Sequence, residues 1–318
     1  MKEKDTKKDS LFEYIAKQVK EDKLPADFSL PVKEETEGGF RFADGAMDGI
    51  IMYHMMGSTL AEEDMAEMLA LIQLISDGEI EKADEALSAF SAKHRALSVI
   101  DDFEDAIRER RGELNAANFY RYGVRLLLKS TEAECVKFGM EILELFTITD
   151  ERVKDIIRIL GLSDEFTLFA VFLMMQWENA NEEIFRLAKN VKGWGRIHAL
   201  EKLKPETDEI RTFFLTEAVN NSVMPDYSAL TCFEKADVPV LLSKDSSDLS
   251  DEEFDGIGTI LAAMLTEGPV PGISAVENKE IVLQKYLEHA NSRELSDAEL
   301  KNAEAIRAYL AQDAAETE

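Results

Sequence analysis

The histidines and cysteines of this 318-residue chain are the residue types that could bind a metal or attack a substrate. No His-Glu-x-x-His pattern places two of the four histidines on one helix face: His54, His94, His198 and His289. Cys135 and Cys232 form no Cys-x-x-Cys pair and lie in helical patterns, so we interpret both as small core residues. These spacings predict neither a metal site nor a disulfide framework.

Motifs for cofactors and nucleophiles are also missing. The chain has no Gly-x-Gly-x-x-Gly, no Gly-x-x-x-x-Gly-Lys-Ser/Thr and no Gly-x-Ser-x-Gly segment. Asp251–Asp255 is similar to the start of a calcium loop, but Ala262 stands where a bidentate glutamate is required. Ser250 as the N-cap of a helix explains that segment better. We therefore expect no metal and no cofactor, and we favour a non-catalytic protein over an enzyme.

Two short segments contain the residues best suited to binding. Trp194, Arg196 and His198 come from one helix start and could face a shared groove. Asp48, in the string Asp44–Gly49, is followed one turn later by Tyr53, and the two could form a small polar pocket. A packing interpretation stays open for both segments, with Trp194 as an anchor between helices and Asp44 as a helix N-cap.

Hydrophobic spacing predicts helices along almost all of the chain after residue 44. Helices are expected to start near residues 132, 165, 195 and 224, which is about every 30 residues. The connections between the helices of this region are short. A helix pair of that length cannot bury its apolar face alone, so successive pairs are expected to stack. The stretch Phe166–Trp177 is apolar all round, which predicts a helix enclosed by its neighbours.

Helix N-termini are marked by four Ser/Thr-x-x-Glu sequences. In this capping box the hydroxyl accepts from a backbone N–H, and the glutamate reaches back to the cap. The boxes begin at Thr59, Thr131, Ser250 and Ser296.

Residues 1–43 are predicted to form an N-terminal arm and residues 44–318 a helical repeat domain. Within the arm, Leu11, Phe12, Ile15 and Val19 predict a short amphipathic helix. Leu30–Val32 and Phe40–Phe42 are candidates for a small hairpin.

The charge of the chain restricts its partners. It has 36 Lys and Arg against 64 Asp and Glu, a net charge of −28 that repels nucleic acid and anionic membrane surfaces. Between Leu241 and Glu318 there are 17 acidic and 6 basic residues. No signal peptide pattern opens the chain, and no apolar stretch reaches the roughly 20 residues needed to span a bilayer. With only two cysteines, a cytoplasmic location is expected.

The run Arg196-x-x-Ala199-Leu200-x-x-Leu203 resembles the Val-Arg-x-x-Ala-h-x-x-Leu helix of HEAT-like and armadillo-like repeats. The resemblance covers about residues 130–245, and Gly195 stands where those repeats usually have an aliphatic residue. The strings 193–198 and 44–49 also resemble bacterial proteins of unknown function that sometimes carry a limonene hydroxylase label. That label implies an oxygenase, and the chain has none of the haem, flavin or nicotinamide motifs described for such enzymes.

Together these patterns predict an all-α, right-handed superhelix of stacked helical hairpins, a HEAT- or armadillo-like solenoid. The expected function is a non-catalytic interaction scaffold that binds a basic protein or peptide on a concave surface. One alternative is an enzyme or small-molecule binder with a pocket near Trp194, Arg196 and His198, together with Asp48 and Tyr53. Another is a purely structural scaffold without a specific ligand.

Overall fold

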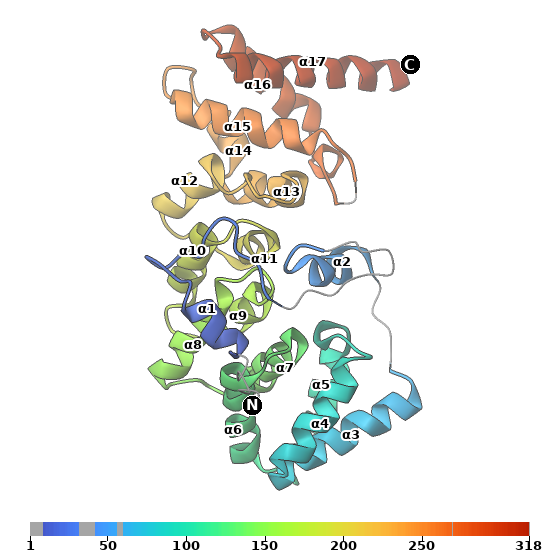
Figure 1. Cartoon of the computed structure of the whole chain (residues 1–318). Coiled ribbons are helices and arrows are strands. Elements are labelled where there is room, and N and C mark those ends of the chain that lie inside the picture. Colours follow the sequence, from blue (N-terminus) through green and yellow to red (C-terminus); the bar gives the residue numbers. More distant parts are fainter. Residues whose placement is uncertain (1–8, 32–41, 56–59, 269, 318) are drawn as a thin grey trace, which may run out of the picture. The chain divides into compact units, whose positions relative to one another are not determined.

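The structure is a computed structural model that describes residues 9–31, 42–55, 60–268 and 270–317. Within these ranges the regular elements are seventeen α-helices and one 3-10 helix, with no β-strand, which confirms the expected all-α class (Figure 1). The expected hairpin between Leu30–Val32 and Phe40–Phe42 falls mainly on residues outside the described ranges.

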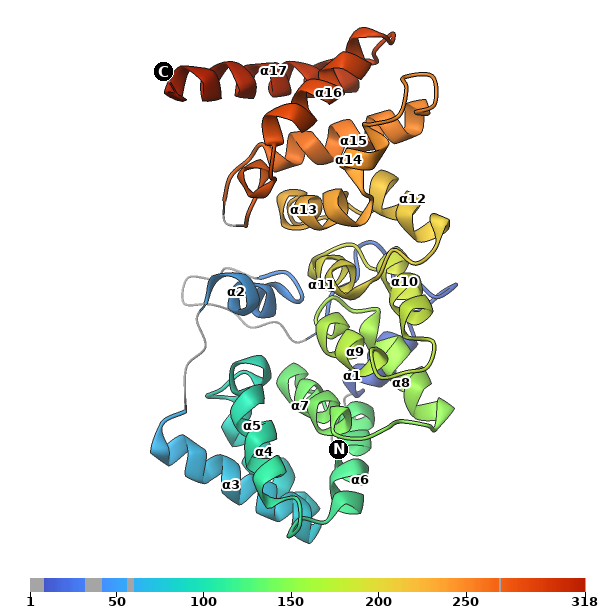
Figure 2. The ribbon, with the colours of Figure 1, turned by 180° about the vertical axis from the view of Figure 1, so that it is seen from behind.

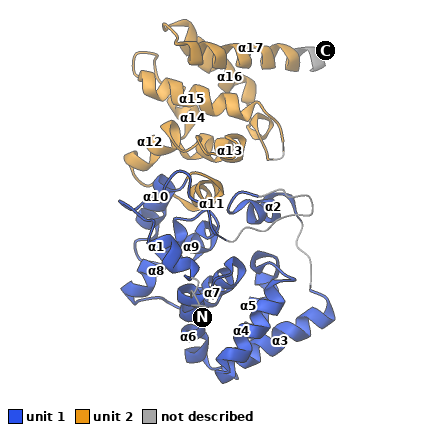
Figure 3. Cartoon of the chain, viewed as in Figure 1, with its two compact units in different colours: residues 1–191 blue, residues 192–318 orange. Residues whose placement is uncertain are grey.

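The chain divides into two compact units, residues 1–191 and 192–318 (Figure 3). The division between Val191 and Lys192 is not foreseen from the sequence, and the arm boundary at residue 43 stays a prediction. The helices of the first unit are α1 (Leu11–Ala16), α2 (Ala46–His54), α3 (Glu62–Asp77), α4 (Ile80–Ser91), α5 (Ala96–Arg110), α6 (Ala116–Lys129), α7 (Ala133–Glu144), α8 (Glu151–Gly161), α9 (Thr167–Met174) and α10 (Ala180–Asn190). Those of the second unit are α11 (Trp194–Lys202), α12 (Asp208–Thr216), α13 (Asp226–Lys235), α14 (Val238–Leu241), α15 (Asp251–Met264), α16 (Lys279–Asn291) and α17 (Asp297–Thr317), with the 3-10 helix at Ile273–Ala275.

The predicted helix starts agree with the observed ones. Helices begin at Ala133, Thr167, Trp194 and Asp226, each within about two residues of its expected position. Consecutive helices pack on one another in both units, as in the pairs α6 with α7, α8 with α9, and α12 with α13.

Two of the four predicted capping boxes are present. The hydroxyls of Ser250 and Ser296 accept from the backbone of Glu253 and Glu299, and both glutamates reach back to the cap. The box predicted at Thr131 is wrong: α7 has Glu132 at its N-cap with no side-chain cap. Thr59 lies outside the described residues.

The short N-terminal helix belongs to the first unit. α1 packs on α6 and α8, with Leu11 and Ile15 buried, and it begins with an unpredicted capping box between Ser10 and Glu13. The Leu11 backbone N–H donates to the carbonyl of Ser130, just after the end of α6, over 2.9 Å. The amphipathic helix expected near Leu11 is therefore present, although it ends at Ala16 and does not include Val19, and it is joined to the helices that it covers.

Helix α7 lies at the centre of the first unit. It packs against α4, α5, α6 and α9, and both views place it among these helices (Figures 1 and 2). Every residue from Glu134 to Leu143 is buried, including charged ones. Glycines let α6 approach closely: a Cβ on Gly139 would lie 2.7 Å from Leu127 Cδ1. The side chains of Glu134, Lys137 and Glu141 therefore have almost no contact with solvent.

The predicted enclosed helix is α9. All but one of its residues are buried, although the neighbouring Met175 is half exposed. This burial within the unit accounts for its apolar sequence. No helix in the described part of the chain has both the length and the hydropathy to cross a membrane.

In the second unit, α13 and α15 connect the other helices. α13 packs on α11 and α12, and α15 packs on α12, α13 and α17. The rings of Phe254 on α15 and Tyr286 on α16 stack with centroids 4.7 Å apart and an interplanar angle of 6°. The core of this unit is thus continuous from α11 to α17.

Candidate functional site

The predicted residues of α11 are all buried in the second unit. Trp194, Arg196 and His198 are 7%, 6% and 1% exposed. The Trp194 ring meets the ring of Tyr227 on α13 edge-on, with centroids 4.9 Å apart, and it lies 6.2 Å from the imidazole of His198. These contacts give Trp194 the role of a packing anchor between helices, and binding of a partner by the three residues stays a prediction.

Two cations hold α11 against its neighbours. Arg196 Nη1 donates to the carbonyl of Asn220 over 3.0 Å, in the segment after α12. Lys235 Nζ donates to the carbonyls of Leu200, Glu201 and Leu203 at the end of α11, over 2.6 to 2.8 Å. The last carbonyls of an α-helix lack a following backbone N–H to accept from, so Lys235 provides a C-terminal cap for α11.

The two predicted residues of α2 belong to the first unit and do not share a helix face. Five positions separate Asp48 from Tyr53, a rotation of about 140° around the axis at about 100° per residue. Asp48 is buried, whereas Tyr53 is half-buried. The interpretation of Asp44 as the N-cap is wrong, since Gly45 occupies that position with φ of 77°. The five predicted residues are therefore divided between the two units.

Asp48 belongs to a buried cluster that the sequence alone does not indicate. Lys137 Nζ lies 2.7 Å from Asp48 Oδ2, 3.0 Å from Glu134 Oε1 and 2.6 Å from Glu165 Oε1. The Lys137 side chain is 0% exposed, and those of its three partners are 2%, 9% and 17% exposed. We name Asp48, Glu134, Lys137 and Glu165 the carboxylate cluster.

Backbone groups fix two of these carboxylates. Glu134 Oε2 accepts from the Ala96 N–H at the start of α5 over 2.8 Å, and its Oε1 accepts from Arg95 Nη1 over 3.2 Å. Glu165 Oε2 accepts from the Gly45 N–H at the start of α2 over 2.7 Å. The helix dipole favours a carboxylate at a helix start. Through these hydrogen bonds, Glu134 joins the start of α5 to the cluster and Glu165 joins the start of α2 to it.

Burial changes the protonation equilibria of the cluster. Burial raises the pKa of Asp48 to about 6, against the opposing attraction of Lys137. Burial alone would lower the pKa of Lys137, but Glu165, Asp48 and Glu134 raise it well above its ordinary value. The three carboxylates therefore favour the charged form of Lys137, whereas a nucleophilic lysine needs a lowered pKa.

Glu141 extends the same face of α7 beyond the cluster. It lies four residues after Lys137 and seven after Glu134, which is helical spacing for one face. Its side chain is fully buried, and neither carboxyl oxygen has a hydrogen-bond partner among the described residues. Burial raises its pKa well above the ordinary value, and the charges of Glu134, Glu144 and Asp48 add to this rise. The surroundings of Glu141 thus favour its protonated form.

A cavity of about 300 Å³ lies beside the cluster. Glu134 and Glu165 contribute to its lining, whereas Asp48 and Lys137 do not. The other lining residues are Leu30, Phe42, Ala43, Asp44, Met47, Ser88, Ser91, Ala92, Arg95, Glu132 and Ala133. Four of the lining residues are acidic and one is basic, so the cavity is suited to a cationic group with an aliphatic chain.

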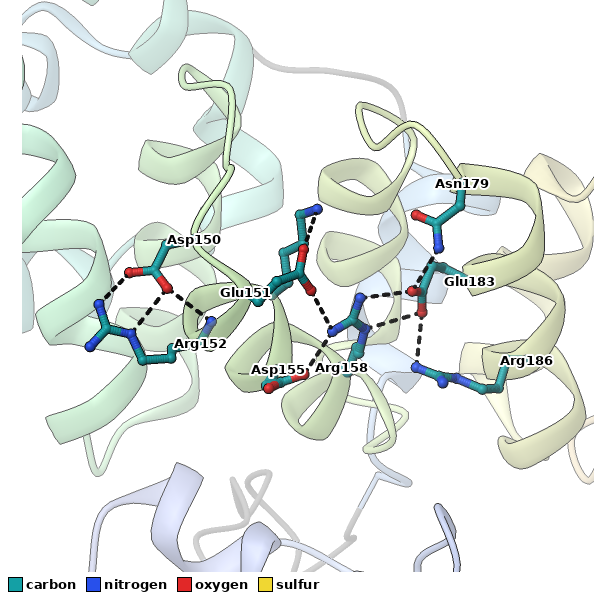
Figure 4. A network of polar contacts seen from close by, with 9 residues as sticks. Asp150, Glu151, Arg152, Asp155, Arg158, Asn179, Glu183 and Arg186 are labelled. Carbon is teal, nitrogen blue, oxygen red and sulfur yellow. Dashed lines mark hydrogen bonds and ion pairs between the residues drawn. The ribbon is translucent and has the colours of Figure 1, made fainter.

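A second cavity, of about 520 Å³, lies near α8 and α10. Charged side chains that line this cavity form ion pairs with one another. Arg158 donates to Glu183 on α10 over 2.8 and 3.2 Å, and to Asp155 over 2.7 Å (Figure 4). Arg186 also donates to Glu183, over 3.0 Å. Such a network joins two helices. We therefore place the candidate site at the carboxylate cluster.

The chain gives no match in comparisons with profiles of known protein families, with curated proteins or with solved structures. The resemblances to HEAT-like and armadillo-like repeats and to the limonene hydroxylase group accordingly stay predictions. In the described residues no three His, Cys, Asp or Glu side chains are arranged to hold a metal ion.

The sequence indicates Asp48 as a candidate residue but not its partners. Glu134 is interpreted as part of a capping box, and Lys137 is hidden in the helical pattern Cys135–Phe138. A signal is nevertheless present, since Glu134, Lys137 and Glu141 recur at the spacing of one helix face, in a helix whose other residues are mostly apolar. Three charges on one face of an otherwise apolar helix indicate either a solvent-facing stripe or a buried ionic cluster.

Proposed function

We propose that the chain is a non-catalytic interaction scaffold that binds a basic protein or peptide. The observation that carries the proposal is the cavity beside the carboxylate cluster, with its four acidic lining residues and one arginine. Apolar side chains such as Leu30 and Met47 can contact the aliphatic part of a lysine or arginine, while the carboxylates attract its charged end.

The charge of the whole chain supports the same partner class. A net charge of −28 accelerates the approach of a cationic partner and repels an anionic one. Nucleic acid and anionic membranes are therefore outside the proposal. Because surface attraction is screened by salt, binding of a basic partner should weaken as the ionic strength rises.

The proposal includes a right-handed superhelix of stacked hairpins, in which the partner occupies a concave surface. Consecutive packed helices in each unit support the stacking of hairpins. The proposed location is the cytoplasm, where thiols stay reduced, and the two cysteines are free and buried.

An enzyme or small-molecule binder at the five predicted residues is the less favoured alternative. Asp48 has the raised pKa expected of a general acid, but it does not line the cavity and so does not reach a ligand held there. His198 is also buried: its side chain is 1% exposed, and burial lowers its pKa to about 4. A side chain with so little exposure has little access to a substrate. A binding function requires only the residues that line the cavity.

Affinity capture from a cell lysate tests the proposal, with bound proteins identified by mass spectrometry. The key variant is Glu132→Lys, because Glu132 is an exposed carboxylate in the cavity lining. Glu109→Lys, at an exposed site on α5 outside this lining, is the control with the same change in total charge. We expect a basic protein to be retained by the wild type and by Glu109→Lys, and lost with Glu132→Lys.

Binding of that protein should then be measured with purified components at about 50 mM and about 500 mM salt, which span a large change in screening. The proposal requires a defined stoichiometry and weaker binding at high salt. Retention of the same protein by Glu132→Lys, or an affinity independent of salt, contradicts it.

A further inference from the structure

The carboxylate cluster contains more negative than positive charge. Asp48, Glu134 and Glu165 all contact one lysine nitrogen, and the only second cation with a hydrogen bond to the cluster in the described residues is Arg95, which reaches Glu134. Ionised groups in a protein interior are costly unless each is paired. With Asp48 ionised, the cluster therefore favours the arrival of either a proton or another cation.

Glu141 is an independent sign of the same deficit. Both of its carboxyl oxygens are buried without a hydrogen-bond partner in the described structure, on the α7 face that also presents Glu134 and Lys137. Its pKa is raised by the charges of Glu134 and Asp48 as well as by burial, so its carboxyl group lies within the field of the cluster. Burial and the neighbouring carboxylates therefore both favour the protonated form of Glu141, as expected where negative charge exceeds positive charge.

Glu134 and Glu165 connect this deficit to the neighbouring cavity. Both contact Lys137 Nζ on one side, and both contribute to the cavity lining on the other. A cationic group in the cavity would therefore interact with carboxylates that are already part of the cluster. Its charge would act on Asp48 through the same low-dielectric interior.

We propose that one lysine or arginine side chain of the partner enters this cavity and supplies the positive charge that the carboxylate cluster lacks, in exchange for a proton. This inference rests on the proposed function and names the group recognised at that site. The proton leaves the carboxyl group of Asp48 for solvent, and no covalent bond other than O–H is broken.

The charged groups around Asp48 determine the direction of this exchange. It is faced from α7 by Lys137 and Glu134, and from the segment before α9 by Glu165. Arg95, just before α5, contacts Glu134. Because the pKa of Asp48 is about 6 in the free protein, a large fraction of this residue is protonated at pH 5 and little at pH 7. A bound cation favours the ionised form, so the affinity should increase from pH 5 to pH 7.

The test is calorimetric titration of the full chain with an octa-lysine peptide at fixed ionic strength. The matched control peptide has the same eight residues acetylated on their side chains, which removes the charge and keeps the aliphatic stem. Titration at pH 6 in buffers of different ionisation enthalpy gives the number of protons released. We compare the wild type with Asp48→Asn, which cannot release a proton, and with Glu109→Lys as a surface control.

For the wild type we expect about fivefold tighter binding at pH 7 than at pH 5, as follows if the bound cation lowers the pKa of Asp48 from about 6 to about 5, with about 0.4 proton released at pH 6. Asp48→Asn should bind with little dependence on pH and release almost no proton. The acetylated peptide should not bind.

Two results overturn the inference and leave the proposed function standing. One is pH-independent binding of octa-lysine without proton release, and the other is unchanged proton release in Asp48→Asn. Complete failure of octa-lysine to bind contradicts both. Binding without proton release by the wild type overturns the inference by itself, so this outcome does not depend on the folding of Asp48→Asn.

Discussion

The Glu134 carboxylate lies 3.0 Å from the Nζ atom of Lys137, one turn later in α7, and both side chains are buried. The second oxygen of Glu134 accepts from the Ala96 backbone N–H over 2.8 Å. Glu134 is therefore used to join α7 to the start of α5, which is why it does not form the capping box predicted with Thr131. A buried salt bridge of this kind is more sensitive to the loss of one partner than to the neutralisation of an excess charge.

Replacement of Lys137 by methionine is expected to destabilise the first unit strongly. The Lys137→Met variant leaves Asp48, Glu134 and Glu165 without their shared cation, and loss of one partner of a buried ion pair costs about 3–5 kcal/mol. Asp48→Asn should change the free energy of unfolding by only about 1 kcal/mol, since burial already disfavours the ionised form of this residue.

Urea denaturation monitored by circular dichroism measures both effects at pH 7.5. Lys82→Met provides the control, because the Lys82 side chain is 66% exposed. Equal losses of stability for Lys137→Met and Asp48→Asn would show that the cluster does not depend on its single lysine.

The stability of the second unit should decrease in mild acid because of His198. Burial lowers the pKa of His198 to about 4, with a further contribution from Lys202. The stabilising contribution of neutral His198 is complete above the unfolded-state pKa of about 6.5 and is lost as the pH falls from there toward 4. At pH 4.5 the difference amounts to about 2–3 kcal/mol.

His198→Phe removes this titration and keeps a ring next to Trp194. We expect the wild type to lose about 2–3 kcal/mol more than the variant between pH 7 and pH 4.5, measured by denaturation of the full chain at each pH. Parallel pH profiles for the two proteins would be inconsistent with a neutral, buried His198.

The close approach of α6 and α7 predicts a large effect of one methyl group. A Cβ at Gly139 would lie 2.8 Å from Leu126 Cβ and 3.1 Å from the carbonyl oxygen of Gly123. Gly139→Ala is therefore expected to lower the free energy of unfolding by about 1–3 kcal/mol, typical of overpacking. At Gly112 a Cβ would meet nothing within 4 Å, so Gly112→Ala should leave the stability unchanged or slightly increase it.

Thermal unfolding of the two alanine variants under identical conditions provides the comparison. A similar melting temperature for both would mean that α6 and α7 can separate without cost.

Removal of the Tyr286 hydroxyl should stabilise the second unit. This side chain is fully buried, and its oxygen has no hydrogen-bond partner in the described residues. Tyr286→Phe keeps the ring that stacks on Phe254 and removes an unsatisfied polar atom, which should raise the free energy of unfolding by about 1 kcal/mol. A loss of stability in urea denaturation would instead reveal that the hydroxyl makes a favourable interaction.

The fold class is predictable from the sequence because the relevant forces are local. Apolar periodicity and the hydroxyls of Ser250 and Ser296 act within one helix, so they place helices and N-termini correctly. The box at Thr131 fails because Glu134 binds a backbone group of another helix. Lys137 and Glu165 are 28 residues apart, and the pairing of such distant charges depends on how α7 and α9 pack. The candidate site therefore depends on tertiary packing. From the sequence alone, only Asp48 and the spacing of charges along α7 can be recognised.

The most direct test of the proposed binding site is a crystal structure of the full chain with the octa-lysine peptide at pH 7. We predict that one lysine ammonium lies within hydrogen-bond distance of the Glu134 or Glu165 carboxylate, with its aliphatic chain along Leu30 or Met47. A bound peptide whose side chains all remain outside this cavity would contradict the account.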